Sequence, residues 1–155
     1  MNLRLLLARL VLVLSLLCVC LLPPAPTSAA DFQPPVPAVL DAGFSFYAKA
    51  GAELALDTWR KGGLAEADSV KIAAQLGYVR QAERAVGNYR SYDVIEARRI
   101  GASSRILYLS INYQRGAVYA RFVVFRTEKD WVVQSMDFSL KPETIMPWLA
   151  FEAAN

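Results

Sequence analysis

Four stretches rich in β-branched and aromatic residues follow one another between Ser91 and Leu140, separated by short polar turns. This composition is typical of strands that pack on a pleated surface, and the short connections predict consecutive antiparallel neighbours. We expect strands over residues 92–100, 104–114, 117–127 and 131–140. Together they predict a four-stranded antiparallel meander.

The register of the two central strands is predicted from Arg115-Gly116, where glycine permits a two-residue hairpin turn. Gln114 then pairs with Ala117, and alternate side chains fall on two faces. The more apolar face carries Leu107, Leu109, Ile111, Tyr113, Val118, Ala120, Phe122 and Val124. The other face carries Tyr108, Ser110, Asn112, Tyr119, Arg121, Val123 and Phe125. We expect the apolar face to be covered by helices.

Two segments before the strands have apolar side chains at the three- and four-residue spacing of an amphipathic helix. Residues 38–61 predict one helix, which its glycines weaken by about 1 kcal/mol each relative to alanine, so that a break near Gly43 fits the pattern. Residues 69–86 predict a second helix, capped by Asp68. The predicted fold class is α+β, with N-terminal helices packed on the concave face of a curved four-stranded antiparallel meander sheet.

The start of the chain has the pattern of an export signal over residues 1–30. Arg4 and Arg9 precede an apolar run, prolines end the run, and small residues follow at 28–30. A membrane anchor is the alternative, but the run is shorter than the roughly 20 residues of a membrane span, so no stable span is expected after cleavage. We expect an exported protein, periplasmic or secreted, with a single domain over residues 31–155.

Cleavage of the signal changes the composition of the protein. Both cysteines and two arginines precede residue 31, so Lys+Arg falls from 17 to 15 against 14 Asp+Glu, and the net charge falls from +3 to +1. Such a nearly neutral domain is not expected to bind nucleic acid. The chain has no histidine, which excludes catalysis and metal binding by imidazole. After cleavage it also has no cysteine, which excludes thiol nucleophiles and thiolate metal sites. No metal and no cofactor are predicted.

Asp137 is the candidate general base. If Glu128-Lys129 forms a two-residue turn, Asp137 pairs with Ala120 on the apolar face, where a buried carboxylate would suit catalysis or anchor a polar ligand. Tyr113 is its candidate catalytic partner. The alternative is a carboxylate near a strand end that is solvated or bonded to a backbone amide, and a shifted turn would move Asp137 to the outer face.

A row of cations suggests a second kind of site. The predicted register places Arg105 opposite Arg126, with Trp131 on the same face. Like charges directly opposed cost stability, which an anion, a carboxylate from elsewhere or stacking on Trp131 would offset. These three residues are therefore the candidate binding site for a small or anionic ligand or for an acidic protein surface. The alternative is that the arginines lie at frayed strand ends on a solvated face.

The outer face of the sheet is the candidate interface. Tyr108, Tyr119, Arg121 and Phe125 are residue types that are enriched where proteins meet. A homodimer through the sheet, or contact with an envelope protein, is one interpretation. The other is that the apolar tail over residues 141–155, which contains Trp148, covers this face or packs on a partner.

The order of two helices and a four-strand meander resembles the nuclear-transport-factor-2-like superfamily, cone-shaped and cystatin-like α+β proteins that include small exported bacterial members. The aromatic opening of the last strand, Asp130-Trp131-Val132-Val133, adds to this resemblance, which covers roughly residues 38–140. It implies helices inside a strongly curved sheet and frequent sheet-to-sheet dimers. The superfamily contains isomerases, dehydratases, ligand carriers and noncatalytic modules, so the fold does not determine the function.

Three hypotheses about function follow. The first is an exported noncatalytic module that binds a small ligand or a protein. The second is an enzyme of the isomerase or dehydratase type that uses Asp137 with a tyrosine such as Tyr113, which requires both side chains in an open cone. The third is a structural or assembly protein that docks through its C-terminal tail.

Overall fold

The chain builds a sheet in which strands adjacent in sequence are adjacent in space. A computed structural model describes residues 35–148, which belong to the compact unit Gln33–Asn155. The strands are β1 (Tyr89–Arg99), β2 (Ser104–Tyr113), β3 (Ala117–Arg126) and β4 (Trp131–Ser139), in the order β1-β2-β3-β4. The predicted antiparallel meander and α+β class are confirmed, although β1 begins earlier than predicted. The predicted export signal lies outside the described residues.

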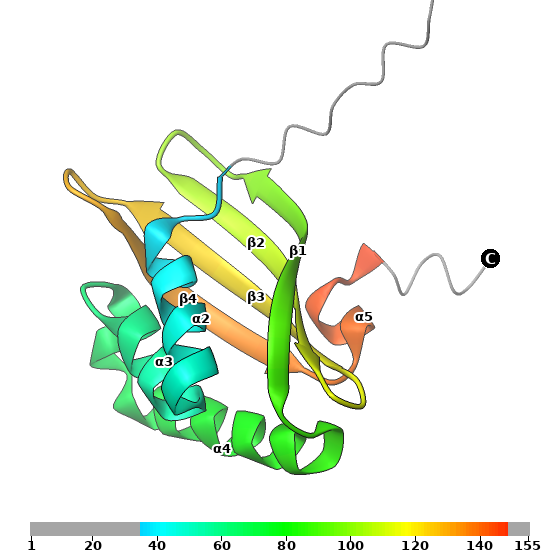
Figure 1. Ribbon diagram of the computed structural model, residues 1–155. Coiled ribbons are helices and arrows are strands. Elements are labelled where there is room, and N and C mark those ends of the chain that lie inside the picture. Colours follow the sequence, from blue (N-terminus) through cyan, green and yellow to red (C-terminus); the bar gives the residue numbers. More distant parts are fainter. Residues whose placement is uncertain (1–34, 149–155) are drawn as a thin grey trace, which may run out of the picture. The chain divides into compact units, whose positions relative to one another are not determined.

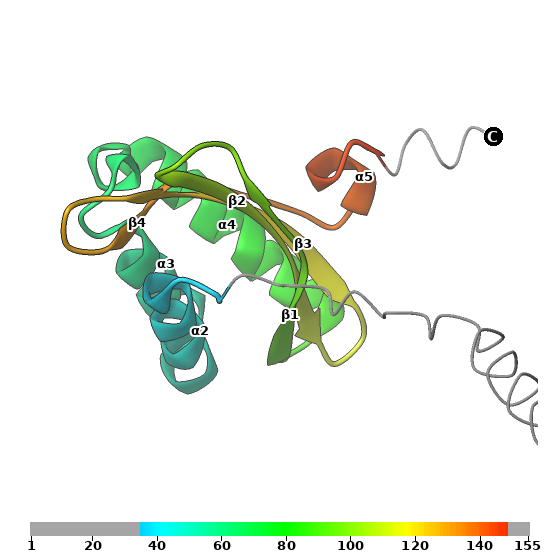
Figure 2. The same cartoon turned by 90° about the horizontal axis from the view of Figure 1, so that it is seen from above.

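Helices precede and follow the sheet. They are α2 (Ala38–Ala50), α3 (Ala52–Arg60), the 3-10 helix η2 (Leu64–Ala67), α4 (Ser69–Val86) and α5 (Pro142–Ile145). As Figures 1 and 2 show, the sheet is curved, α2 and α3 lie against its concave face, and α5 lies on the opposite face. The expected packing of N-terminal helices on the concave face is therefore confirmed. Within residues 35–148, no helix is both long and apolar enough to cross a membrane.

The predicted helix over residues 38–61 is two helices, and its break is at Gly51 rather than near Gly43. Gly51 has φ +86°, a conformation that glycine adopts without strain, and it ends α2. Gly43 stays helical because it packs on Trp59, where a Cβ would lie 1.8 Å from the indole Nε1. One glycine turns the chain, and the other lets α2 and α3 approach each other closely.

The β2–β3 hairpin differs from its predicted register by two residues. Asn112, not Gln114, is opposite Ala117. The turn residues Gln114 and Arg115 donate their backbone N–H groups to the carbonyls of Asn88 and Val86, so contacts with the end of α4 decide where the turn lies. A shift of two residues leaves every side chain on its face. The predicted apolar face is accordingly buried: Leu107, Leu109, Ile111, Tyr113, Val118, Ala120, Phe122 and Val124.

The β3–β4 hairpin has the predicted turn but gains an extra residue further along. Arg126 is opposite Trp131, as a turn at Glu128-Lys129 requires. The register then shifts, because Val124 is opposite Val133 while Val123 is opposite Ser135. Gln134 is the extra residue of this β-bulge. From here to the end of β4 the faces are the reverse of those predicted.

The expected position of Asp137 on the apolar face is therefore wrong. Asp137 is opposite Arg121 on the outer face, and Met136 and Phe138 take the inner face, 1% and 8% exposed. The bulge keeps the carboxylate out of an apolar interior, where an unpaired charge would be costly. The prediction assumed that side chains alternate between the two faces along the whole strand, so it had no place for the extra residue.

Aromatic rings fill the space between the helices and the sheet. The Phe44 ring lies 4.8 Å from the Trp59 ring and 3.9 Å from the Tyr92 ring, centre to centre. Trp59 in turn meets Phe122 edge to face at 5.0 Å. Trp59 and Phe122 are fully buried. Contacts of this geometry stabilise the core beyond the area that they remove from water.

The C-terminal segment, as far as it is described, packs on the outer face of its own sheet. Ile145 and Met146 are buried against Tyr108, which is 6% exposed. The Trp148 ring meets the Tyr108 ring edge to face at 4.7 Å. The Arg98 guanidinium lies over the Trp148 ring, 4.4 Å from its centre. Of the two expected destinations of the tail, its own domain is the one observed for residues 141–148.

β1 forms one edge of the sheet and contains a bulge of its own. Val94 is opposite Leu109 and Glu96 is opposite Tyr108, so Ile95 has no partner on β2 and is 42% exposed. β4 forms the other edge of the sheet, and there η2 and α4 both contact the strand.

Candidate functional site

The two candidate catalytic residues lie on opposite faces of the sheet. The Asp137 carboxylate is on the outer face, 2.8 Å from Arg121 Nη2 and 3.5 Å from Lys71 Nζ. Tyr113 is on the inner face and 5% exposed. The sheet itself separates them, so they cannot act together on one substrate.

Tyr113 belongs instead to a buried hydrogen-bonded group. The Tyr47 hydroxyl donates to the Glu83 carboxylate at 2.5 Å and lies 2.8 Å from the Tyr113 hydroxyl. Since a hydroxyl has one proton, Tyr113 is the donor to Tyr47. Burial raises the pKa of Tyr113 to about 12, and burial and the neighbouring Tyr113 raise the pKa of Tyr47 further. This geometry ties α2, α4 and β2 together with neutral hydroxyls.

An open groove of about 590 Å³ lies between the start of α2, the β3–β4 turn and the loop after α3. We call it the Trp131 groove. Its lining comprises Ala38, Val39, Ala42, Lys61, Gly62, Arg126, Lys129, Asp130, Trp131 and Val132. Two of the three predicted ligand-binding residues, Arg126 and Trp131, are therefore in one groove.

Positive charge dominates this groove. Lys61, Arg126 and Lys129 are all exposed, and among the described residues none of them forms a salt bridge. Among the described residues, Asp130 is the one acidic residue in the lining. Three cations against one carboxylate leave a local excess that an anionic ligand would balance.

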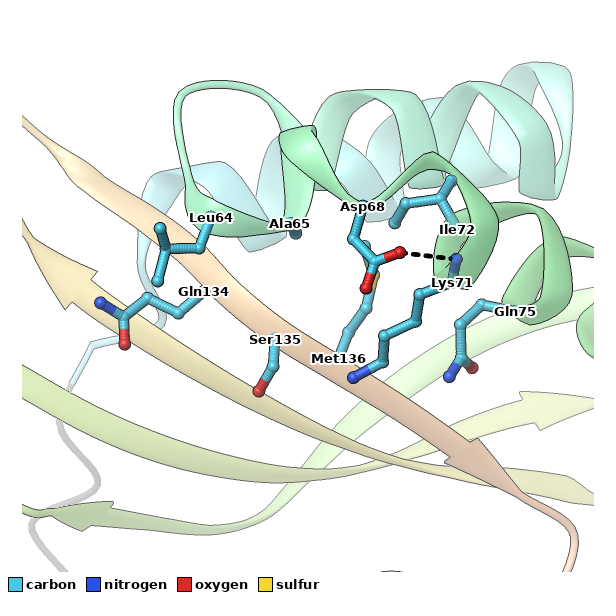
Figure 3. Close-up of a pocket in the computed structure, with 9 residues that line it drawn as sticks. All are labelled: Leu64, Ala65, Asp68, Lys71, Ile72, Gln75, Gln134, Ser135 and Met136. Atoms are coloured by element: carbon cyan, nitrogen blue, oxygen red, sulfur yellow. Dashed lines mark hydrogen bonds between the residues drawn. The ribbon is translucent and has the colours of Figure 1, made fainter.

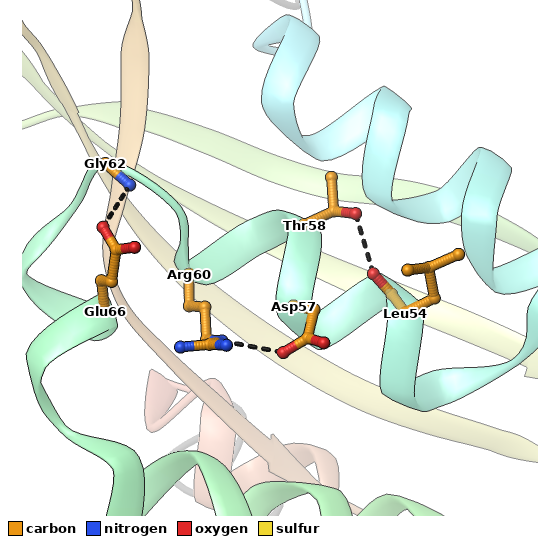
Figure 4. Close-up of polar contacts among 6 residues, drawn as sticks. All are labelled: Leu54, Asp57, Thr58, Arg60, Gly62 and Glu66. Atoms are coloured by element: carbon orange, nitrogen blue, oxygen red, sulfur yellow. Dashed lines mark hydrogen bonds and ion pairs between the residues drawn. The ribbon is translucent and has the colours of Figure 1, made fainter.

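The loop that carries Lys61 is held by short-range polar contacts (Figure 4). The backbone N–H of Gly62 donates to the Glu66 carboxylate at 2.9 Å. The neighbouring Arg60 is already paired, because its Nε lies 2.8 Å from the Asp57 carboxylate. Lys61 is thus the cation that this loop presents to the groove.

The start of α2 adds a second source of positive potential. Pro37 precedes the helix and offers no side-chain cap, and the N–H groups of Leu40 and Asp41 bond to the Pro37 carbonyl. Within the described residues, the N–H groups of Ala38 and Val39 have no such partner. Free N–H groups and the helix dipole favour negative charge at this position.

Arg105 reaches the groove through Trp131. Its guanidinium lies 4.5 Å from the centre of the indole ring, and it donates to the Pro35 carbonyl at 3.4 Å. The predicted pairing of Arg105 with Arg126 is wrong, because Arg105 is opposite Val124 in the observed register. The expected stacking of a cation on Trp131 is observed for Arg105.

The four candidate interface residues do not form one open surface. Tyr108 lies under the tail, and Tyr119 packs against the same cluster. Arg121 is paired with Asp137, and Phe125 is exposed. In this conformation a dimer through the sheet would meet the tail first.

Sequence reasoning missed Lys61 and Lys129 as neighbours of Arg126. Lys129 could have been found, because a cation inside the predicted turn beside Trp131 stays close to both. Lys61 lies far from Arg126 in the sequence, and the packing of α3 on β4 brings the two residues to the same groove. Within residues 35–148, no three His, Cys, Asp or Glu side chains gather as metal ligands would.

The chain was compared with models of protein families, with curated proteins and with solved structures. None of the three comparisons finds a match. The likeness to the nuclear-transport-factor-2-like superfamily therefore stays a prediction from the order of the elements.

Proposed function

We propose that this protein is an exported, noncatalytic binding module, and that its ligand is a small anion held in the Trp131 groove. Export is proposed from the pattern of residues 1–30. The observation that carries the ligand class is the grouping of Lys61, Arg126 and Lys129, without carboxylate partners among the described residues, around one groove.

Two further features support an anion. Ala38 and Val39, at the uncapped N-terminus of α2, belong to the lining, and among the described residues their N–H groups have no hydrogen-bond partner. Trp131 contributes an aromatic wall, stiffened by the stacked Arg105. A ligand with an anionic group and a planar part fits this combination best.

The other two hypotheses have less support. The isomerase or dehydratase hypothesis needs Asp137 beside a tyrosine inside the cone, and the sheet lies between Asp137 and Tyr113. The assembly hypothesis needs Trp148 to be available to a partner, and this side chain is packed between Tyr108 and Arg98. The Trp131 groove, in contrast, is open and has an excess of cations among its described residues.

The proposal is tested by titrating the purified protein with pyrophosphate, citrate and 2-naphthyl phosphate, followed by calorimetry and tryptophan fluorescence. We expect 2-naphthyl phosphate to bind best and its affinity to fall with salt. Arg126→Glu should weaken binding about tenfold or more. The matched control is Arg90→Glu, the same charge change at an exposed position of β1. Equal affinity of the two variants, or no binding of any of the three anions, would overturn the proposal.

A further inference from the structure

A second, smaller pocket lies at the β4 bulge. Its volume is about 200 Å³, and it is enclosed by η2, the first turns of α4 and the middle of β4 (Figure 3). We call it the bulge pocket. Its lining comprises Leu64, Ala65, Asp68, Lys71, Ile72, Gln75, Gln134, Ser135 and Met136, none of which lines the Trp131 groove.

The bulge pocket is built by two backbone features. Gly63 packs so closely on β4 that a Cβ would lie 2.0 Å from the Val133 carbonyl oxygen, which brings η2 against the strand. Directly after Val133 the bulge at Gln134 interrupts the regular pairing of β4 with β3, and η2 and α4 both contact this strand. A bulge beside a hollow is a recurrent feature of binding sites.

Polar groups without partners line the pocket. Among the described residues, the amides of Gln75 and Gln134 and the hydroxyl of Ser135 make no hydrogen bond that would occupy them. In Figure 3 the Ser135 hydroxyl, the Lys71 ammonium and the Gln75 amide all end along one side of the pocket. A ligand could therefore bond to Gln75 on α4 and to Ser135 on β4 without displacing a contact that either side chain makes among the described residues.

Two opposite charges stand at the rim. One oxygen of the Asp68 carboxylate accepts from the Lys71 backbone N–H at 2.9 Å, which leaves its other oxygen without a bond among the described residues. The Lys71 ammonium lies 3.5 Å from the Asp137 carboxylate, which has the closer Arg121 at 2.8 Å. Lys71 can thus turn to a ligand carboxylate while Asp137 keeps a cation.

The rest of the lining is aliphatic. Leu64, Ala65, Ile72 and Met136 contribute apolar side chains, and Met136 and Ala65 are buried. A volume of about 200 Å³ suits a small ligand. The ligand must be small, with an aliphatic part and both signs of charge.

We propose that the bulge pocket binds an aliphatic α-amino acid as its zwitterion. The carboxylate bonds to Lys71 and Ser135, the ammonium faces Asp68, and the side chain lies among Leu64, Ile72 and Met136. This inference is independent of the proposed function of the Trp131 groove, because the two sites share no residue.

The test is a titration of the purified protein with L-leucine, followed by amide chemical shifts and calorimetry. Two analogues each lack one charge: 4-methylpentanoate has no ammonium, and 3-methylbutylamine has no carboxylate. We expect leucine to shift the amides of Gln134 and Ser135 and to bind about tenfold or more tightly than either analogue. If 4-methylpentanoate binds as well as leucine, or if about 10 mM leucine leaves these amides unchanged, the proposal is wrong.

Two variants locate the charges. Lys71→Met should weaken leucine binding about tenfold, and Asp68→Asn should do the same while keeping an N-cap oxygen for α4. The matched controls are Lys49→Met and Glu128→Gln, both exposed and outside the pocket. Equal leucine affinity in the two pocket variants and in the controls would overturn the assignment, and unchanged melting temperatures would show that all four proteins are folded.

Discussion

The two halves of β4 obey different rules. Trp131–Val133 keeps the register that the turn at Glu128-Lys129 dictates, whereas Ser135–Ser139 is displaced by the one extra residue, Gln134. The first half contributes to the Trp131 groove and the second half to the bulge pocket. The contrast teaches that one inserted residue decides which side chains of a strand face the core and which face solvent.

The energetic reason for the difference lies in the side chains after the bulge. With a regular strand, Asp137 would point into the aromatic core and Met136 and Phe138 would point to water. The observed arrangement buries the two apolar side chains and gives Asp137 two cations. The free energy of burying those two side chains and of keeping a charge in solvent is several times the cost of disturbing one ladder contact.

Deletion of Gln134 is the strongest way to break this contrast. Without the extra residue, the second half of β4 must either expose Phe138 or break its pairing with β3. We expect a loss of about 4 kcal/mol or more in the free energy of unfolding, measured by urea denaturation. Gln134→Ala is the control, since it keeps the length of the strand and should cost less than about 1 kcal/mol. Similar stabilities for deletion and substitution would mean that the bulge has no such role.

Alanine substitutions on the two sides of the bulge compare the faces directly. Phe138→Ala removes a ring that packs on Phe122 and Trp59, and we expect a loss of about 3 kcal/mol. Val132→Ala, in the half-exposed position on the outer face of the first half, should cost less than about 1 kcal/mol. Thermal or urea unfolding measures both, and a Val132 effect as large as the Phe138 effect would contradict the assigned faces.

Alkaline pH reports on the inner face. The pKa of Tyr113 is raised to about 12 in the folded protein, so folding favours its protonated form. Its contribution is fully present below the ordinary tyrosine pKa of about 10 and is lost as the pH rises towards about 12, by roughly 2 kcal/mol. Tyr113→Phe should make unfolding less sensitive to pH across this range. An identical slope in the variant, in urea titrations at each pH, would show that Tyr113 does not contribute.

The smallest effect is expected at Asp137, on the outer face of the second half. Asp137→Asn removes a half-exposed carboxylate that joins Lys71 and Arg121, and such pairs contribute up to about 1 kcal/mol each. A double-mutant cycle with Arg121→Gln measures the coupling, which should fall at high salt. A loss of more than about 3 kcal/mol would point to a buried carboxylate, and thus to the regular strand.

The sequence predicted well whatever depends on local spacing. The bounds of α4, its cap at Asp68, the four strands and the apolar face of β2 and β3 follow from periodicity and turn residues. The apolar positions Trp131, Val133, Met136 and Phe138 even record the bulge, because their spacing is two, then three across Gln134, and then two again. The prediction treated β4 as a regular strand and ignored this change of spacing. It therefore placed Asp137 on the same face as Tyr113, and the candidate catalytic pair is wrong for that reason.

The remaining misses depend on contacts between distant segments. The position of the β2–β3 turn follows from hydrogen bonds to the end of α4, which no property of Arg115 or Gly116 reveals. Lys61 joins Arg126 and Lys129 because α3 packs on β4 and the loop after α3 lines the same groove. Local patterns predict the helices and strands, whereas both pockets form where elements that are distant in the sequence meet.

The irregular β1 has a consequence for the protein in concentrated solution. An outermost strand of eleven residues offers unsatisfied backbone groups to other chains and could seed fibrils. Here the unpaired Ile95 distorts the strand, and five charged side chains, Arg90, Asp93, Glu96, Arg98 and Arg99, follow its length. A second chain would have to match both the distortion and the charges, so the strand guards the folded protein against self-assembly.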